Sequence, residues 1–183
     1  AGDVALLERL GPGLGFEVQV IADVSGEDGD RISSTRIRGL LAEGRVAEAA
    51  DLLGGLHTIR SLVVHGHARG RTLGYPTANL APDIEGFIPR DGVYAAWLIA
   101  DGVRYPAAVS IGNNPTFEGI PDKTVEAHAI DQSFDLYDRA IEIAFVEYIR
   151  PMHKFPDADA LAHQMALDED GIRVILGVPP RVG

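Results

Sequence analysis

The segment 66–79 has the composition of a phosphate-binding loop. It reads GHARGRTLGYPTAN and carries three glycines in its first nine residues, directly after a predicted strand. Glycines allow a backbone to curl and to present successive N–H groups to an anion. The segment is not a P-loop, because its spacing is one residue short, Arg71 stands in place of lysine, and Pro76 blocks the helix that must follow. An ordinary turn between two strands accounts for the same glycines.

Thr77 and Asn79, which end this segment, have side chains that suit a magnesium ion. A Thr hydroxyl and an Asn carbonyl are hard oxygen ligands, and phosphoryl transfer needs Mg²⁺ between phosphate oxygens. Two residues apart in an extended segment, they are expected on the same side of the backbone. The alternative is that both cap a turn after Pro76, since these residue types are common in turns.

Glu126 is the candidate general base. The run VEAHAID at 125–131 alternates as a strand does, which places Glu126, His128 and Ile130 on one face and three small apolar residues on the other. A carboxylate on that face could take the proton from an attacking hydroxyl. A solvated strand face explains the same pattern, and from the spacing alone it is the favoured interpretation.

A second polar loop is expected at 110–117, SIGNNPTF, after another predicted strand. Its Gly, Asn and Pro residues could simply turn the chain, or the segment could form a flap over a ligand.

Five or six strands and one helix are expected to position these residues. The β-rich segments are 57–65, 93–100, 103–111, 124–130 and 141–149. Asp101-Gly102 between two of them is a two-residue hairpin signal. Segment 157–176 has apolar residues at helical spacing and predicts an amphipathic helix against the sheet. The predicted fold class is mainly β (α+β), a small antiparallel barrel with a C-terminal helix on its side.

The first 54 residues have a different texture. A helix is predicted over 4–10, stopping at Gly11-Pro12-Gly13, followed by a strand over 16–21. Ser33 or Ser34 is expected to cap a helix that ends at Glu43, and a second short helix covers 46–53. Two regions are therefore predicted, 1–54 and 55–183.

Composition and net charge limit the classes of partner that the chain is expected to bind. The 183 residues carry a net charge of −11, and both 1–54 (ten acids, five bases) and 55–183 (seventeen acids, eleven bases) are acidic. Nucleic acid is not expected as a partner, because phosphate backbones are bound by an excess of Lys and Arg. No apolar run approaches the ~20 residues of a membrane helix. With no cysteine, disulfides and thiolate metal sites are excluded, and a cytoplasmic location is expected.

The run 70–79, GRTLGYPTAN, resembles the signature of the riboflavin kinase family, whose hallmark is Pro-Thr-Ala-Asn. Further blocks match that family in its order, at 92–94, 110–117, 125–128, 136–137 and 145–155. The resemblance covers residues 57 to about 168. It implies a six-stranded Greek-key barrel that transfers the γ-phosphate of ATP to the 5′-hydroxyl of riboflavin, giving FMN and ADP.

The resemblance also implies roles for the candidate residues. Thr77 and Asn79 would bind Mg²⁺ and the ATP phosphates, and Glu126 would be the catalytic base. Arg150, Asn113 and the C-terminal helix would border the flavin. The glycine-rich loop would enclose the nucleotide through Gly66, Ala68, Gly70, Arg71 and Gly74.

Residues 31–38, RISSTRIR, resemble the Ile-Ser-Ser-Thr-Arg motif of nucleotidyltransferases. In bacterial bifunctional FAD synthetases this motif ends the FMN adenylyltransferase domain that precedes the kinase. Hydroxyls and amides at a helix N-terminus suit an ATP phosphate, which makes Ser33, Ser34, Thr35 and Arg36 a vestigial phosphate site. The family's His-x-Gly-His motif is absent, so residues 1–54 would be the C-terminal fragment of a partial α/β domain.

The partial N-terminal domain leads to three expectations about activity and association. The chain is expected to make FMN but no FAD, whereas the full-length protein would also adenylylate FMN. An apolar face of the fragment, on the Val18/Val20 or Leu6/Leu10 side, would favour self-association. Kinase activity is expected to survive deletion of residues 1–54, since every block of the kinase resemblance lies beyond them.

The main rival from another class is a non-catalytic flavin- or nucleotide-binding barrel. Replacing Glu126 discriminates the two, because loss of turnover with retained binding would indicate an enzyme.

Overall fold

The computed structural model describes residues 3–26, 28–65, 75–113, 123–132 and 135–180. The chain forms two compact units, residues 1–33 and residues 34–183, and each is described by itself.

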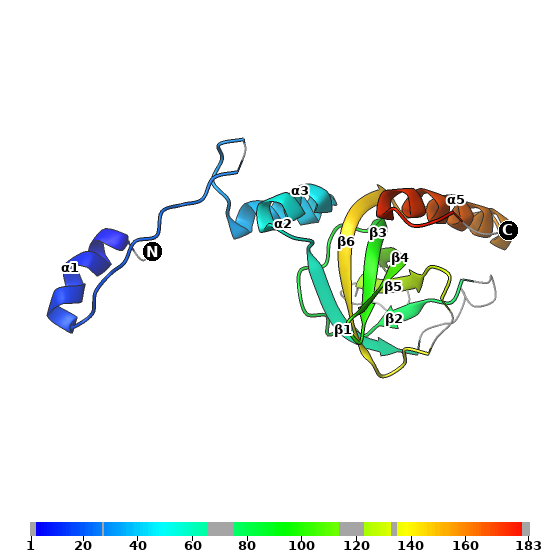
Figure 1. Cartoon of the computed structure of the whole chain (residues 1–183), viewed down its shortest axis with the longest axis horizontal. Helices are drawn as coiled ribbons and strands as arrows, with labels where there is room; N and C mark the ends of the chain where they lie inside the picture. The colour runs from blue at the N-terminus through cyan, green and yellow to red at the C-terminus, as the bar shows by residue number, and fades with distance from the viewer. Residues whose placement is uncertain (1–2, 27, 66–74, 114–122, 133–134, 181–183) are drawn as a thin grey trace. The chain divides into compact units, whose positions relative to one another are not determined.

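The larger unit is built on a closed barrel of six strands (Figure 1). The strands are β1 (Thr58–Val64), β2 (Ala78–Leu80), β3 (Gly92–Ala100), β4 (Val103–Asn113), β5 (Lys123–Ala129) and β6 (Ala140–Arg150). They close in the order β1-β2-β5-β4-β3-β6, and every pair is antiparallel. The five predicted strands and the barrel are confirmed. The sixth strand, β2, is the short extended segment that follows Pro76.

The inside of the barrel is filled by side chains. In β1 exposed and buried residues alternate, so that Ile59 and Val63 point inward while Arg60 points outward. Tyr94 and Phe145, the two largest fully buried side chains, meet edge-on at 5.2 Å between ring centroids. Each such apolar side chain contributes about 1.5–3 kcal/mol when it is removed from water. The described side chains on the inner face of the barrel therefore form its hydrophobic core.

The predicted hairpin turn is present between β3 and β4. Asp101 and Gly102 both have positive φ, 50° and 77°, as a type I′ turn requires. The pairing continues from Ala100 opposite Val103 to Gly92 opposite Ile111. This long hairpin supplies two of the strands that line the cavity described below.

Helix α5 (Ala158–Leu176) packs on the outer surface of the barrel, against β3, β4 and β6 (Figure 1). It begins where the Asp157 side chain accepts a hydrogen bond from the Ala160 N–H at 2.8 Å, and it ends at Gly177, whose φ is 65°. Ile172 packs with Ala95 and Ile130 of the barrel wall. The predicted C-terminal helix is confirmed.

Helices α2 (Ser34–Glu43) and α3 (Val46–Leu53) belong to the same compact unit as the barrel. Their side chains Leu40, Leu41, Val46 and Ala49 are buried in the core cluster that contains the barrel interior. The Arg90 N–H donates to the Leu41 carbonyl at 3.0 Å. The compact unit thus begins at Ser34, whereas the boundary between domain families predicted after residue 54 stays a prediction.

The described residues of the smaller unit, 3–26 and 28–33, form helix α1 (Val4–Leu14) and an extended segment. The helix runs past the predicted stop, because Pro12 is accommodated inside it and the chain leaves helical geometry only at Gly15, whose φ is 77°. The strand predicted over 16–21 is wrong. A strand needs a neighbour to accept its backbone hydrogen bonds, and in the described part of this unit the only bridge joins Ser25 to Arg31.

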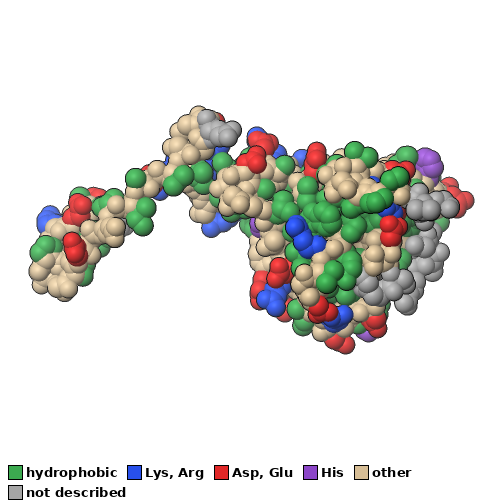
Figure 2. All heavy atoms as spheres, viewed as in Figure 1, with side chains coloured by type: hydrophobic (Ala, Val, Ile, Leu, Met, Phe, Trp, Pro, Cys, Tyr) green, Lys and Arg blue, Asp and Glu red, His purple; other side chains and the backbone are tan. Residues whose placement is uncertain are grey.

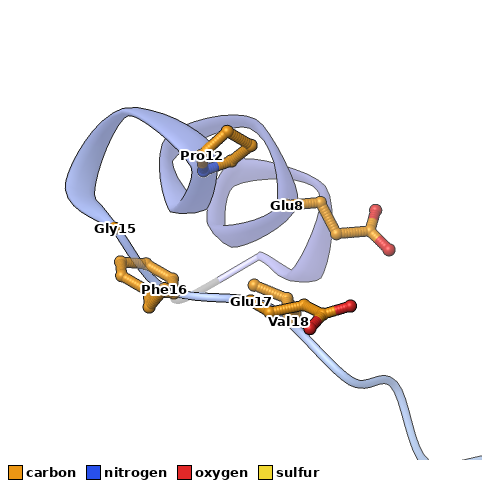
Figure 3. Close-up of a pocket in the computed structure, with 6 residues that line it drawn as sticks. All are labelled: Glu8, Pro12, Gly15, Phe16, Glu17 and Val18. Atoms are coloured by element: carbon orange, nitrogen blue, oxygen red, sulfur yellow. The ribbon is translucent and has the colours of Figure 1, made fainter.

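The end of α1 and the segment after it enclose a hollow lined by Glu8, Pro12, Gly15, Phe16, Glu17 and Val18 (Figure 3). The Phe16 ring lies under the helix, and the two carboxylates lie on the same side of the hollow.

Unit 1–33 exposes much of its apolar surface (Figure 2). Leu6, Leu10 and Val20 are all more than a third exposed, and Ile21 is 85% exposed. The exposed apolar face predicted for this fragment is therefore present. Self-association through that face stays a prediction.

Candidate active site

The strand register brings the polar candidates into one row across the outer face of the barrel. Asn79 on β2 lies opposite Glu126 on β5, and Glu126 lies opposite Ser110 on β4. Ser110 lies opposite Val93 on β3, which lies opposite Arg150 on β6. Residues directly opposite each other in a sheet point to the same face. The row therefore gathers residues that are up to 71 positions apart in the sequence.

A cavity of about 590 Å³ lies between this outer face and α5. Its apolar wall includes Val93, Met152, Phe155, Leu161 and Met165. Polar groups line the rest of it: Thr77, Ser110, Glu126, His128, Arg150, His153, Asp157, Asp168 and Glu169. The volume lies within the range of small-molecule sites, ~300–1,000 Å³.

Glu126 and Thr77 meet at one edge of the cavity. The Thr77 hydroxyl donates to Glu126 Oε2 over a long 3.4 Å, and Asn79 Nδ2 donates to the Thr77 carbonyl at 3.5 Å. The structure thus brings together the three side chains for which sequence predicted metal and base chemistry. Asn79 itself lies beside this edge, opposite Glu126 in the register.

The two faces of β5 divide as the alternation predicts. Val125, Ala127 and Ala129 are buried in the barrel core. The favoured interpretation of the other face as solvated is wrong, because His128 is only 8% exposed and Ile130 is fully buried. Helix α5 covers this side of the barrel, and Ile130 packs against Ile172 of that helix. Glu126 is half-buried at the edge of the covered region.

Arg150 is held by a carboxylate that sequence analysis did not single out. Its Nε donates to both oxygens of Asp168 at 2.9 and 3.0 Å, and its Nη2 donates to Asp168 Oδ2 at 2.6 Å. Gln164 Nε2 donates to the same carboxylate at 2.8 Å. The side chains of Arg150 and Asp168 are 16% and 6% exposed. The pair fixes the guanidinium in the cavity wall.

A second buried arginine ties α5 to the barrel. Arg173 Nη2 donates to Glu169 Oε1 at 2.7 Å and to Asp131 Oδ1 at 2.6 Å. The hydrogen bond to Asp131 raises the pKa of the Arg173 guanidinium above its usual value, so this buried group stays charged. Glu169 also lines the cavity. The only sequence signal for these acids is the i,i+4 spacing of Gln164 with Asp168 and of Glu169 with Arg173.

Of the remaining predicted residues, five fall outside the described residues, one ends β4, and four lie at the start of α2. Gly66, Ala68, Gly70, Arg71 and Gly74 fall outside the described residues. Asn113 ends β4 with its backbone opposite Lys123, and its side chain is outside the description. Ser34 begins α2, Thr35 and Arg36 lie in its first turn, and Ser33 directly precedes it.

No group of three or more His, Cys, Asp or Glu side chains converges as a metal cluster in the part of the chain that the structure describes. Within those same residues, no helix combines the length and the apolarity needed to cross a membrane.

A cavity of this size with an apolar wall and several polar groups is typical of a site for a small molecule. Comparison with known proteins gives the family of the chain. The sequence model described as riboflavin kinase matches residues 53–176, and the chain belongs to that family.

The relatives are longer proteins. The chain is 38% identical over 178 residues to the bifunctional riboflavin kinase/FMN adenylyltransferase of Escherichia coli K12, covering 97% of this chain and 56% of that protein. It is 37% identical over 158 residues to the protein of the same name from Listeria monocytogenes, covering 86% and 50%. The chain thus spans about half the length of the curated relatives it matches.

Among solved structures, the chain is similar to one described as a macrolide-efflux protein from Streptococcus pneumoniae. The TM-score is 0.79 and the identity is 39%, covering 91% of this chain and 54% of that one.

Proposed function

We propose that this chain transfers the γ-phosphate of ATP to the 5′-hydroxyl of riboflavin, giving FMN and ADP. The observation that carries the proposal is the meeting of Glu126 and Thr77 at the edge of the apolar cavity, in a chain of the riboflavin kinase family. A cytoplasmic location is proposed for the chain, because the reaction uses ATP.

The cavity suits a flavin. A tricyclic ring is apolar on its faces and carries polar groups on its edges, which matches a wall of Val93, Met152 and Leu161 beside the fixed guanidinium of Arg150. We place the ring against α5 and direct the ribityl chain toward Glu126. Asn113 is proposed as a further flavin contact.

Glu126 is proposed as the general base. Its carboxylate accepts the proton of the riboflavin 5′-hydroxyl, and the oxygen forms a bond to the γ-phosphorus. The bond between that phosphorus and the oxygen bridging to the β-phosphate breaks, and ADP leaves.

Thr77 and Asn79 are proposed as the magnesium ligands. Their donor set fits, since Asn79 uses Nδ2 in its contact with Thr77 and its amide oxygen is not used there. A hydroxyl and an amide oxygen are hard donors of the kind that Mg²⁺ prefers. When bound, the ion neutralises charge on the transferring phosphate. The segment 66–74 is proposed to enclose the ATP phosphates.

One assay tests the function. The chain is incubated with riboflavin, ATP and Mg²⁺, and the flavins are separated by chromatography. FMN is expected from the unaltered chain, and Glu126→Gln is expected to lose ~100-fold or more of the turnover while still quenching riboflavin fluorescence on binding. Binding without turnover in the unaltered chain would instead indicate a non-catalytic flavin-binding barrel.

A further inference from the structure

His128 is a buried polar residue of the cavity wall that the proposed chemistry does not use. It follows Glu126 by two positions on the same face of β5 and is 8% exposed. Its Nδ1 lies 2.8 Å from the carbonyl oxygen of Pro76. A carbonyl can only accept a hydrogen bond, so Nδ1 must carry the proton and donate it.

The bond reaches the backbone directly before the proposed metal ligand Thr77. The last residues in register between β2 and β5 are Ala78 opposite Ala127. The two preceding residues, Pro76 and Thr77, lie outside this ladder. The His128 side chain therefore supplies a hydrogen-bond donor to the Pro76 carbonyl just before β2 begins.

A neighbouring aromatic ring packs against His128. The Tyr75 ring, itself buried, meets the imidazole edge-on at 5.2 Å between centroids with an interplanar angle of 69°. Thr77 is thus fixed from two sides by one strand. Its hydroxyl contacts Glu126, and the carbonyl that precedes it accepts from His128.

We propose that His128 is a positioning residue, whose Nδ1–H···O=C bond to Pro76 fixes the backbone of residues 76–77 and so places the Thr77 hydroxyl beside Glu126. The inference rests on the proposed function. Misplacement of a reacting group by ~1 Å can cost ~100-fold in rate, and loss of an outer-shell hydrogen bond to a metal site costs ~10–100-fold.

Three substitutions separate the hydrogen bond from packing. In His128→Asn the side-chain NH₂ occupies the place of Nδ1, and the donor is retained. In His128→Phe the ring and its contact with Tyr75 are retained, and the donor is lost. In His128→Gln the donor is moved one bond further from the backbone.

The donor, and not the ring, is expected to decide activity. His128→Phe and His128→Gln should lower kcat ~10–100-fold, change the KM for riboflavin by less than ~3-fold, and raise the Mg²⁺ concentration needed for half-maximal rate. His128→Asn should stay within ~5-fold of the unaltered chain. A His128→Phe variant with near-normal kcat, or equal losses in Asn and Phe with unchanged Mg²⁺ dependence, would overturn the proposal.

A measurement that needs no turnover tests the bond itself. Two-bond ¹H–¹⁵N correlation spectra of the unaltered chain at pH ~8.5, where an ordinary histidine is neutral, should show His128 protonated at Nδ1 and not at Nε2. Protonation at Nε2 would sink the proposal. If the chain proved inactive on riboflavin, the proposed function would fail while this spectrum still decided whether His128 holds Pro76.

Discussion

At the scale of single residues, Thr77 and Asn79 are distinguished from other hydroxyl and amide side chains by their position beside a carboxylate. The register places Asn79 opposite Glu126, and the Thr77 hydroxyl is in contact with the Glu126 carboxylate. If they ligate Mg²⁺, Thr77→Ala and Asn79→Ala should each lower kcat at least ~100-fold. Thr77→Ser is the matched control, because it keeps the oxygen and should keep most of the activity. Near-normal turnover by a folded Asn79→Ala chain would contradict the assignment.

His57 makes the stability of the barrel unit depend on pH. Its Nε2 donates to the Phe87 carbonyl at 2.7 Å, its ring stacks on Phe145, and burial lowers its pKa. The unfolded chain therefore binds a proton at this residue at a higher pH than the folded chain does. Stability should be complete above the unfolded pKa of ~6.5 and should fall as pH decreases through and below that value.

Urea denaturation at pH ~7.5 and ~5.5 measures this effect. The loss of stability between the two pH values should be smaller in His57→Gln, which lacks the titrating group. The matched control is His163→Gln at an exposed position of α5. An equal pH dependence in His57→Gln and the unaltered chain would rule the assignment out.

The candidate residues that sequence reasoning identified are those whose signal is local. Thr77, Asn79 and Glu126 lie in short runs with strand alternation, and their side could be assigned from that alternation. The contacts of His128 with Pro76 and of Arg150 with Asp168 join positions 52 and 18 residues apart. They depend on how β5 meets β2 and how α5 meets β6, which no local pattern contains.

At the scale of elements, α5 is attached to the barrel by charge as well as by apolar contact. Asp168 neutralises Arg150, and removing it would leave a guanidinium at 16% exposure without its ion-pair partner. Asp168→Ala should therefore lower the free energy of unfolding by about 3 kcal/mol, at the low end for breaking a buried pair. Asp170→Ala, an exposed acid on the same helix, should change it by less than about 0.5 kcal/mol. Equal melting temperatures for the two variants would contradict this.

Elements with signals inside their own sequence were predicted correctly, and one that depends on a partner was not. The β3–β4 hairpin is encoded by Asp101-Gly102, and α5 by the Asp157 cap and its helical spacing. Residues 16–21 have strand composition, yet their backbone groups have no neighbouring strand among the described residues of that unit. Strand propensity without a pairing edge does not make a strand.

At the scale of the whole molecule, the packing of α2 and α3 revises the expected effect of truncation. Leu41, Val46 and Ala49 are buried at 1% exposure or less in the core cluster shared with the barrel. Deleting residues 1–33 should leave the stability and the proposed kinase activity intact. Deleting residues 1–54 should cost several kcal/mol, since burying a Leu or Val side chain is worth about 1.5–3 kcal/mol.

Thermal melts and FMN formation measured on both truncated chains test this difference. The result that would contradict it is a 1–54 deletion that melts and turns over like the 1–33 deletion.

The two activities named for the relatives should separate in this chain. Adenylyl transfer needs groups that orient the α-phosphate and stabilise the leaving pyrophosphate. Among the described residues of 1–54, the groups proposed for a phosphate are the hydroxyls and amides at the N-terminus of α2, together with Arg36. We expect FMN from riboflavin and ATP, and no FAD from FMN and ATP. Chromatography of the second reaction checks this, with the full-length E. coli relative as positive control. FAD that depends on this chain would overturn it.

The position of the cavity outside the barrel wall has a consequence for how the family can change. Along β5, Val125, Ala127 and Ala129 fill the interior, while Glu126 and His128 face the cavity. Selection for a stable fold and selection for ligand binding therefore act on alternate residues of the same strand. A substitution on the cavity side can alter which molecule is accepted without opening a void in the core, and a barrel of this kind can acquire new substrates while keeping its architecture.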